Sequence, residues 1–290
     1  MSKSYQVLIV GGGAAGLATA ASLKKRDRSL EVAVVEPSDK HYYQPGWTMV
    51  GAGVFTKEDT IKDTDSIWPS DVIRIKDEVI KFDPKNNKVT LGNKTEVGYE
   101  MLVVASGLKL DWEAIEGLSE SLGENGVTSN YRYDLAPYTW ELVQEMNGKN
   151  AIFTQPPMPI KCAGAPQKAM YLSCDHWQKS GQLEGMNVSF CNAGPVLFGC
   201  ATYVPPLMKY VEKYGINLDF GHNLTKIDGP SKKAWFSVKK EGEDAKTIER
   251  SFDMIHVCPP QRAPDFIKNS PLANEGGWVD VNAETLQHNK

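Results

Sequence analysis

A glycine-rich turn near the N-terminus has the residue types and spacing that bind a dinucleotide. Residues 11–16 read G-x-G-x-x-G, and they lie between an apolar predicted strand and a run of helix-forming residues. Gly11 permits a tight turn, Gly13 lets a pyrophosphate approach the backbone, and Gly16 allows close packing of helix on strand. Free N–H groups at the helix start would face the phosphates. The predicted phosphate-binding residues are Gly11, Gly13, Ala14, Ala15 and Gly16.

An acidic residue completes this fingerprint. Glu36 lies 20 residues after Gly16, at the end of a second predicted strand, where its carboxylate can accept hydrogen bonds from ribose hydroxyls. The same carboxylate disfavours NADP, whose additional phosphate would meet a negative charge. The sequence therefore predicts a bound dinucleotide, and the alternative is a tight turn in an α/β fold that binds nothing.

The second chemical centre is a cysteine in a proline-rich loop. Residues 152–168 read IFTQPPMPIKCAGAPQK, which predicts a strand, a loop and a helix that begins at Pro166. Lys161 and the helix N-terminus both favour the thiolate form of Cys162. A thiolate can attack sulfur or carry a persulfide. The alternative is a small buried cysteine with no reaction.

The same loop lacks the features of a second dinucleotide site. Gly164 is its only glycine, and it holds Pro156, Pro157 and Pro159, which have no N–H groups to offer a pyrophosphate. We therefore expect a second α/β unit that does not bind a nicotinamide cofactor. Its electrons would come from a donor other than NAD(P)H.

Weaker signals mark further cofactor contacts. The aromatic loop 41–47, which contains Gln44, follows the ribose-binding acid; it packs along the cofactor or merely covers a domain edge. Val79 lies where an extended backbone could pair with an adenine. The residues Ala105, Ser106 and Gly107 resemble the A-T-G turn of FAD-binding Rossmann domains.

The remaining cysteines and His256 are open to two interpretations. Cys174 and Cys191 fall in a predicted helix and strand and are expected in the core, Cys200 lies in a loop, and Cys258 precedes two prolines. Their spacing fits neither a metal site nor a disulfide framework. His256 ends a strand and could relay protons; the alternative is a core histidine bonded to the backbone.

The coarse pattern predicts an α/β protein with two Rossmann-like, three-layer domains. Residues 1–110 form the first part of the dinucleotide-binding domain, 111–265 form the second domain with Cys162, and 266–290 return toward the first. Val72–Lys81 is predicted as one strand.

Composition excludes several classes of protein. Hydrophobic content of 41%, charged content of 23% and a net charge of -4 fit a soluble globular chain and disfavour nucleic-acid binding. No signal peptide and no apolar run long enough to span a bilayer is present in the chain.

Taken together, these residues resemble the sulfide:quinone oxidoreductases, in particular the mitochondrial-type group with a glutathione reductase-type fold. The most specific segments are HYYQP at 41–45, KCAGAPQK at 161–168, HVCPP at 256–260 and GWVDV at 277–281. The resemblance implies FAD in the first Rossmann unit and a redox pair of cysteines beside the flavin, of which Cys162 matches the first. Lys161, next to it, would help keep Cys162 ionised; the alternative is a solvated loop residue.

The family activity implied is oxidation of sulfide to persulfide-level sulfur, with electrons passing through FAD to a membrane quinone. The implied partners are hydrogen sulfide, a sulfur acceptor, the quinone and a membrane surface; a homo-oligomer is left open. A peripheral membrane location on the cytoplasmic face follows.

The family's second cysteine and its membrane-binding segment lie further C-terminal than Lys290, so we expect this chain to be truncated, and its own turnover is left open. The alternatives are a type II NADH:quinone dehydrogenase-like flavoprotein and a flavin-binding fragment with no activity.

Overall fold

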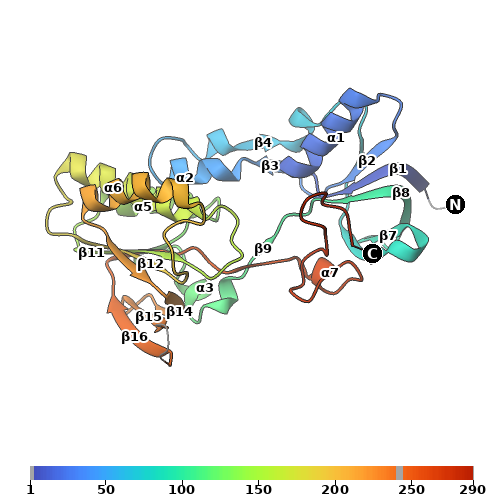
Figure 1. The fold of residues 1–290 in the computed structure, drawn as a ribbon. Helices are drawn as coiled ribbons and strands as arrows, with labels where there is room; N and C mark the ends of the chain where they lie inside the picture. Colours follow the sequence, from blue (N-terminus) through green and yellow to red (C-terminus); the bar gives the residue numbers. More distant parts are fainter. Residues whose placement is uncertain (1–2, 240–243, 290) are drawn as a thin grey trace. The chain divides into compact units, whose positions relative to one another are not determined.

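The computed structural model describes residues 3–239 and 244–289, which divide into two compact units (Figure 1). Unit 1 comprises the described residues within 1–42, 61–109 and 262–290, and unit 2 comprises those within 43–60 and 110–261. The predicted domain boundaries thus differ from these units, because residues 43–60 and 110 cluster with unit 2 and residues 262–265 cluster with unit 1.

Unit 1 is built on one mixed sheet. Its strand order is β5-β2-β1-β8-β7-β6, in which the first four strands run parallel and β7 and β6 are antiparallel additions. Its elements are β1 (Lys3–Val10), α1 (Ala14–Arg26), β2 (Val32–Val35), β3 (Lys40–Tyr42), β4 (Ile61–Asp63), β5 (Ile73–Ile75), β6 (Val79–Asp83), β7 (Lys88–Leu91), β8 (Glu96–Val104) and α7 (Asp265–Lys268). Two short strands, β9 (Lys109–Leu110) and β18 (Gln261–Arg262), pair where the chain passes between units.

Both faces of this sheet are covered, as the continuous apolar run of β1 requires. Val7 and Ile9 face α1 and pack with Ala20, whereas Leu8 and Val10 face the opposite side, because successive side chains of a strand alternate. Figure 1 shows α1 on one face and α7 on the other. The sheet therefore presents the carboxyl ends of β1, β2 and β8 at one edge, where the glycine-rich turn begins.

Unit 2 contains a five-stranded parallel sheet of order β10-β17-β11-β12-β13. Its strands and main helices are α2 (Trp47–Val50), α3 (Leu118–Ser121), β10 (Val127–Thr128), α4 (Ala136–Gln144), β11 (Asn150–Gln155), α5 (Gly164–Ser180), β12 (Asn187–Asn192), α6 (Val204–Tyr214), β13 (Asn217–Phe220), β14 (His222–Asp228), β15 (Lys233–Val238), β16 (Lys246–Ser251) and β17 (Met254–His256). Short 3-10 helices of unit 2 occupy Gln44–Gly46, Glu58–Thr60, Trp112–Ala114 and Ala201–Tyr203, and those of unit 1 occupy Thr64–Ile67 and Pro84–Asn86.

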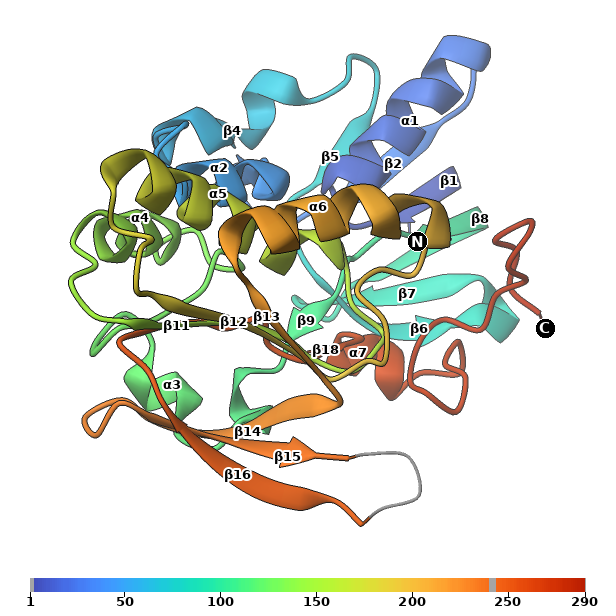
Figure 2. The same ribbon diagram turned by 60° about the vertical axis from the view of Figure 1, so that its left-hand side comes forward.

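The parallel sheet of unit 2 lies between two layers. On one face, α4, α5 and α6 bury a core that includes Phe153, Trp177 and Phe190. On the other, the antiparallel sheet β14-β15-β16 covers Ile152, Cys191 and Ile255. Figure 2 shows α5 and α6 above β11 and β12, with β14, β15 and β16 below them. This is the predicted three-layer α/β arrangement.

Two predicted boundaries are wrong. Val72–Lys81 is not one strand: β5 and β6 are separate and lie at opposite ends of the six-stranded sheet, because a turn intervenes in which the Asp77 N–H donates to the Ile75 carbonyl. Helix α5 begins at Gly164, two residues before Pro166. Pro166 is tolerated there because an N–H in the first helical turn has no partner within the helix.

Within residues 3–239 and 244–289, no helix is both long enough and apolar enough to cross a bilayer.

Candidate functional site

The glycine-rich turn has the conformation that its sequence predicts. Gly11 adopts a φ of +101°, and its N–H donates to the Val35 carbonyl at 2.9 Å. A Cβ on Gly16 would lie 1.8 Å from the Gly11 carbonyl oxygen, so no side chain fits there. A Cβ on Gly13 would meet nothing within 4 Å in the described part of the chain. Gly11 and Gly16 are thus needed by the turn itself, whereas Gly13 leaves open space in front of it.

The structure places the Glu36 carboxylate beside this turn. Oε2 accepts a hydrogen bond from the Gly12 N–H at 2.7 Å, and Oε1 accepts one from the Ser38 N–H at 2.7 Å. The acid thus lies at the end of β2, next to the start of α1. This is the neighbourhood that a ribose-binding role requires.

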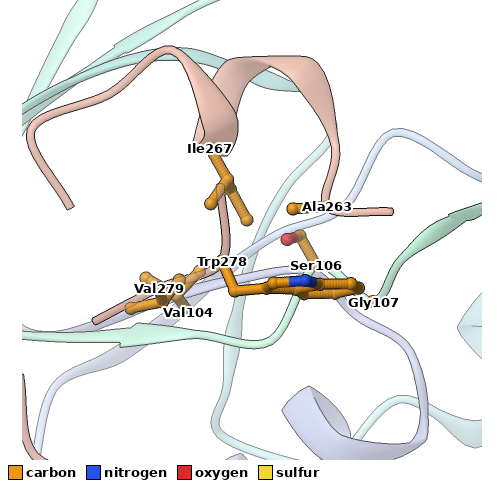
Figure 3. A pocket seen from close by; sticks show the side chains of 7 residues that line it. All are labelled: Val104, Ser106, Gly107, Ala263, Ile267, Trp278 and Val279. Carbon is orange, nitrogen blue, oxygen red and sulfur yellow. The ribbon is translucent and has the colours of Figure 1, made fainter. Parts of the chain in front are cut away.

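The turn after β8 joins the same neighbourhood. The Ala105 N–H donates to the Val10 carbonyl at 2.8 Å, and a Cβ on Gly11 would lie 2.6 Å from the Ala105 oxygen. Ser106 and Gly107 line a cavity of about 210 Å³ together with Trp278. Figure 3 shows the Trp278 indole across the Ser106–Gly107 turn, with Ile267 and Ala263 facing it.

These features fit a dinucleotide cofactor. The Ser106 Oγ is buried without a hydrogen-bond partner in the described residues, as expected of a group that serves a ligand. The open space at Gly13 and the α1 N-terminus suit a pyrophosphate. Val79 is a buried residue at the start of β6, paired with Leu91, and no hydrogen bond within the described residues links it to the turn; its adenine contact stays a prediction.

Cys162 lies between β11 and α5 in an uncommon backbone conformation. Its side chain is exposed, and its φ is +58°, a left-handed value that costs a residue with a Cβ about 1–3 kcal/mol. The Cys162 carbonyl accepts hydrogen bonds from the Ala165 N–H at 2.8 Å and the Tyr131 hydroxyl at 3.4 Å. The loop thus holds the thiol at the surface, immediately before the first turn of α5.

Lys161 is fixed at both ends beside this thiol. Its N–H donates to Gln261 Oε1 at 2.5 Å, and its ammonium contacts Gln44 Oε1. Partial burial of its ammonium lowers the pKa of Lys161, while Cys162 acts in the opposite direction. Gln44, predicted to touch the cofactor, is thereby placed with Lys161 in unit 2.

Asn130, Tyr131 and Gln261 belong to the site although sequence reasoning missed them. Asn130 and Tyr131 line a cavity of about 50 Å³ with Cys162 and Lys161. Burial is the main reason that the pKa of Tyr131 is far above its ordinary value. A signal was present: a polar Ser129-Asn130-Tyr131 run follows a buried strand, and ligands of open α/β sheets bind at the carboxyl ends of strands.

The structure gives His256 the position of a core histidine. The side chain is 0% exposed, and its Nε2 accepts a hydrogen bond from the Asn130 N–H at 2.9 Å. Burial lowers the pKa of His256 to about 4, so the ring is neutral near pH 7. These observations favour the structural alternative over a proton relay.

The other cysteines divide by exposure. Cys200 is exposed, whereas Cys174, Cys191 and Cys258 are buried. Burial raises the pKa of Cys174 and of Cys191 to about 12, and it raises the pKa of Cys258 further still. Cys162 is therefore the exposed thiol that combines a strained backbone, a neighbouring ammonium and a cavity.

Comparison with known proteins shows which family this chain is similar to. Residues 5–140 match the pyridine nucleotide-disulphide oxidoreductase family, whose members bind FAD. The chain is 42% identical over 288 residues to the mitochondrial sulfide:quinone oxidoreductase of Dictyostelium discoideum, covering 98% of this chain and 63% of that protein. It is 34% identical over 311 residues to the Schizosaccharomyces pombe counterpart, covering 100% and 67%.

A solved structure shows the same fold. The sulfide:quinone oxidoreductase of Aquifex aeolicus is 20% identical to this chain, with a TM-score of 0.80 over 97% of this chain and 65% of that one. The chain spans 63% of the length of the Dictyostelium relative, which is less than two thirds. On the extent and identity of these matches, the chain belongs to the sulfide:quinone oxidoreductase family.

Proposed function

We propose that this protein oxidises sulfide to persulfide-level sulfur at Cys162 and passes the electrons through FAD to a membrane quinone. The observation that carries the proposal is the setting of Cys162. This thiol is exposed, in a left-handed backbone conformation, beside Lys161 and at the carboxyl edge of a parallel sheet. Strained backbone is concentrated at functional positions, and exposed thiols near positive charge are the reactive ones.

Residues of unit 1 would hold the cofactor. The backbone of Gly11, Gly13 and the α1 N-terminus would bind the pyrophosphate, because it offers free N–H groups and the positive end of the helix dipole. Glu36 would accept a hydrogen bond from a ribose hydroxyl, and the unpartnered Ser106 hydroxyl would bind a polar group of the same cofactor.

The reaction at Cys162 joins the sulfur of hydrosulfide to Sγ. Forming this S–S bond releases two electrons and leaves the terminal sulfur as a persulfide anion. When bound, FAD would supply the acceptor for these two electrons and for the proton of hydrosulfide. Lys161 would stabilise the negative charge at both the thiolate and the persulfide stage, since its ammonium is held by Gln44 close to the loop.

Steps that need the rest of a full-length relative are part of the same proposal. The chain spans 63% of the Dictyostelium protein. The proposal also includes a second redox cysteine, a quinone site and a peripheral membrane surface. The location on the cytoplasmic face of a membrane, the sulfur acceptor and a homo-oligomer also stay proposals.

The test is a single-turnover reaction of the FAD-loaded chain with sulfide under anaerobic conditions. We expect an added sulfur atom on the Cys162 peptide by mass spectrometry after alkylation, together with loss of visible flavin absorbance. Cys200→Ser is the matched control, because Cys200 is the other exposed thiol. Cys200→Ser should behave as the wild type. Cys162→Ser should show neither the added sulfur atom nor the loss of flavin absorbance. Normal flavin reduction in Cys162→Ser would contradict the proposal.

A further inference from the structure

One residue that lines the small cavity beside Cys162, Asn130, has a buried side-chain amide without a hydrogen-bond partner among the described residues. Asn130 is 5% exposed, and neither its Nδ2 nor its Oδ1 has a hydrogen-bond partner among the described residues. Buried polar side chains are normally satisfied, so an amide without a partner, in a residue that lines a cavity, is the kind of group that serves a ligand. The same cavity is lined by Cys162, Lys161 and Lys168.

Asn130 is held in this position from two sides. Its backbone N–H donates to the fully buried His256 Nε2 at 2.9 Å. Its amide packs against Gly51, where a Cβ would lie 2.3 Å from Oδ1 and 2.6 Å from Nδ2. Gly51 has a φ of -64°, so its backbone does not itself require glycine. The absence of a side chain at residue 51 is what leaves room for the amide.

The cavity's size and charge define the ligand. Its volume is about 50 Å³, room for a few non-hydrogen atoms and too small to enclose a nicotinamide. Lys161 and Lys168 make its wall positive, and within the described residues no carboxylate lines it. An amide N–H and ammonium groups around a cysteine fit a small sulfur anion attached to Sγ.

We propose that this cavity is a subsite for the terminal sulfur of a Cys162 persulfide, with the Asn130 amide as its hydrogen-bond donor. The inference rests on the proposed function and adds a positioning residue to it. Lys161 and Lys168 supply the charge, and Gly51 keeps the amide in place.

Inorganic hydrodisulfide loads this site without a redox partner. The Cys162 thiolate attacks it, the bond between its two sulfurs breaks, hydrosulfide leaves, and the transferred sulfur is bonded to Sγ. One S–S bond forms for each that breaks, so no oxidant is needed. The exchange therefore measures how well the subsite holds sulfur, independently of the flavin.

The experiment compares persulfide occupancy at Cys162 and Cys200 in the same molecules, at a fixed ratio of hydrodisulfide to hydrosulfide. Cys200 is exposed and does not line this cavity, so it serves as an internal reference. We expect Asn130→Leu to lower the Cys162-to-Cys200 ratio about tenfold, since a hydrogen bond to an anion is lost. Asn130→Asp should lower it further, because a carboxylate would repel the persulfide anion.

Gly51→Ala is the second test, because it displaces the amide without altering it. It should reproduce the loss seen in Asn130→Leu, with melting temperatures confirming that the variants are folded. Ratios within twofold of the wild type in folded Asn130→Leu and Gly51→Ala would overturn the inference. If wild-type Cys162 takes up no sulfur at all, the proposed function fails with it.

Discussion

At the scale of single residues, the five cysteines should differ sharply in reactivity. Cys162 and Cys200 are exposed, whereas Cys174, Cys191 and Cys258 are buried with raised pKa values. Iodoacetamide at pH 8 should therefore label two thiols in the folded protein and five after unfolding, as counted by mass spectrometry. Rapid labelling of Cys174 or Cys191 in the folded protein would contradict the buried positions.

Two glycines of the same turn should respond differently to alanine. Gly16→Ala should lower the free energy of unfolding by about 3 kcal/mol or more, because its Cβ would overlap the Gly11 carbonyl oxygen. Gly13→Ala should leave the cofactor-free protein as stable as the wild type, since its Cβ enters open space. Denaturant unfolding in the absence of FAD measures both effects.

The same Gly13→Ala variant should weaken FAD binding by more than about tenfold, because the methyl group would occupy the space assigned to the pyrophosphate. Titration of the stripped protein with FAD measures the affinity. Unchanged affinity in a stable Gly13→Ala variant would place the pyrophosphate elsewhere.

At the scale of elements, His256 ties the end of β17 to Asn130, two residues after β10. The pKa of the buried ring is lowered to about 4 from its ordinary value of 6.5, so the unfolded chain binds the proton more readily. The free energy of unfolding therefore has its full value above about pH 6.5. It falls by up to about 3 kcal/mol as the pH drops toward 4.

His256→Gln should remove this dependence while keeping a hydrogen-bond acceptor for the Asn130 N–H. Urea unfolding at pH 7 and pH 4 should show a larger loss in the wild type than in the variant. Equal losses would mean that the ring titrates normally and is not buried in solution.

Local patterns were enough to predict the elements around the dinucleotide site. The strand, glycine turn, helix and acid are contiguous within residues 3–36, so each feature limits the next. The α5 start was misplaced by two residues, since proline is allowed at several positions in a first helical turn. Val72–Lys81 was misread because a short turn between two apolar strands leaves the periodicity almost unbroken.

The thiol site was only half predictable for a physical reason. Cys162 and Lys161 are adjacent in sequence, but Asn130 is fixed by His256 across 126 residues, and its amide fits because residue 51 is glycine. Such partnerships depend on strand order in the sheet, β10 beside β17 and β17 beside β11, which one sequence does not specify. The place of residues 43–60 in unit 2 was missed for the same reason.

At the scale of the whole molecule, the proposal requires an electron donor other than NADH. The β11–α5 loop carries prolines at 156, 157 and 159 where a second dinucleotide site would present N–H groups, and it ends in an exposed thiol instead. Unit 1 retains its glycine turn, open space and acid. The proposal thus assigns the nucleotide cofactor to unit 1 and the sulfur chemistry to unit 2.

The most direct test adds sulfide or NADH, anaerobically and in separate samples, to the FAD-loaded protein while flavin absorbance is recorded. Sulfide should bleach the flavin in the wild type and in Cys200→Ser but not in Cys162→Ala, and NADH should leave all three unchanged. Rapid bleaching by NADH with no response to sulfide would contradict the assignment and favour an NADH dehydrogenase.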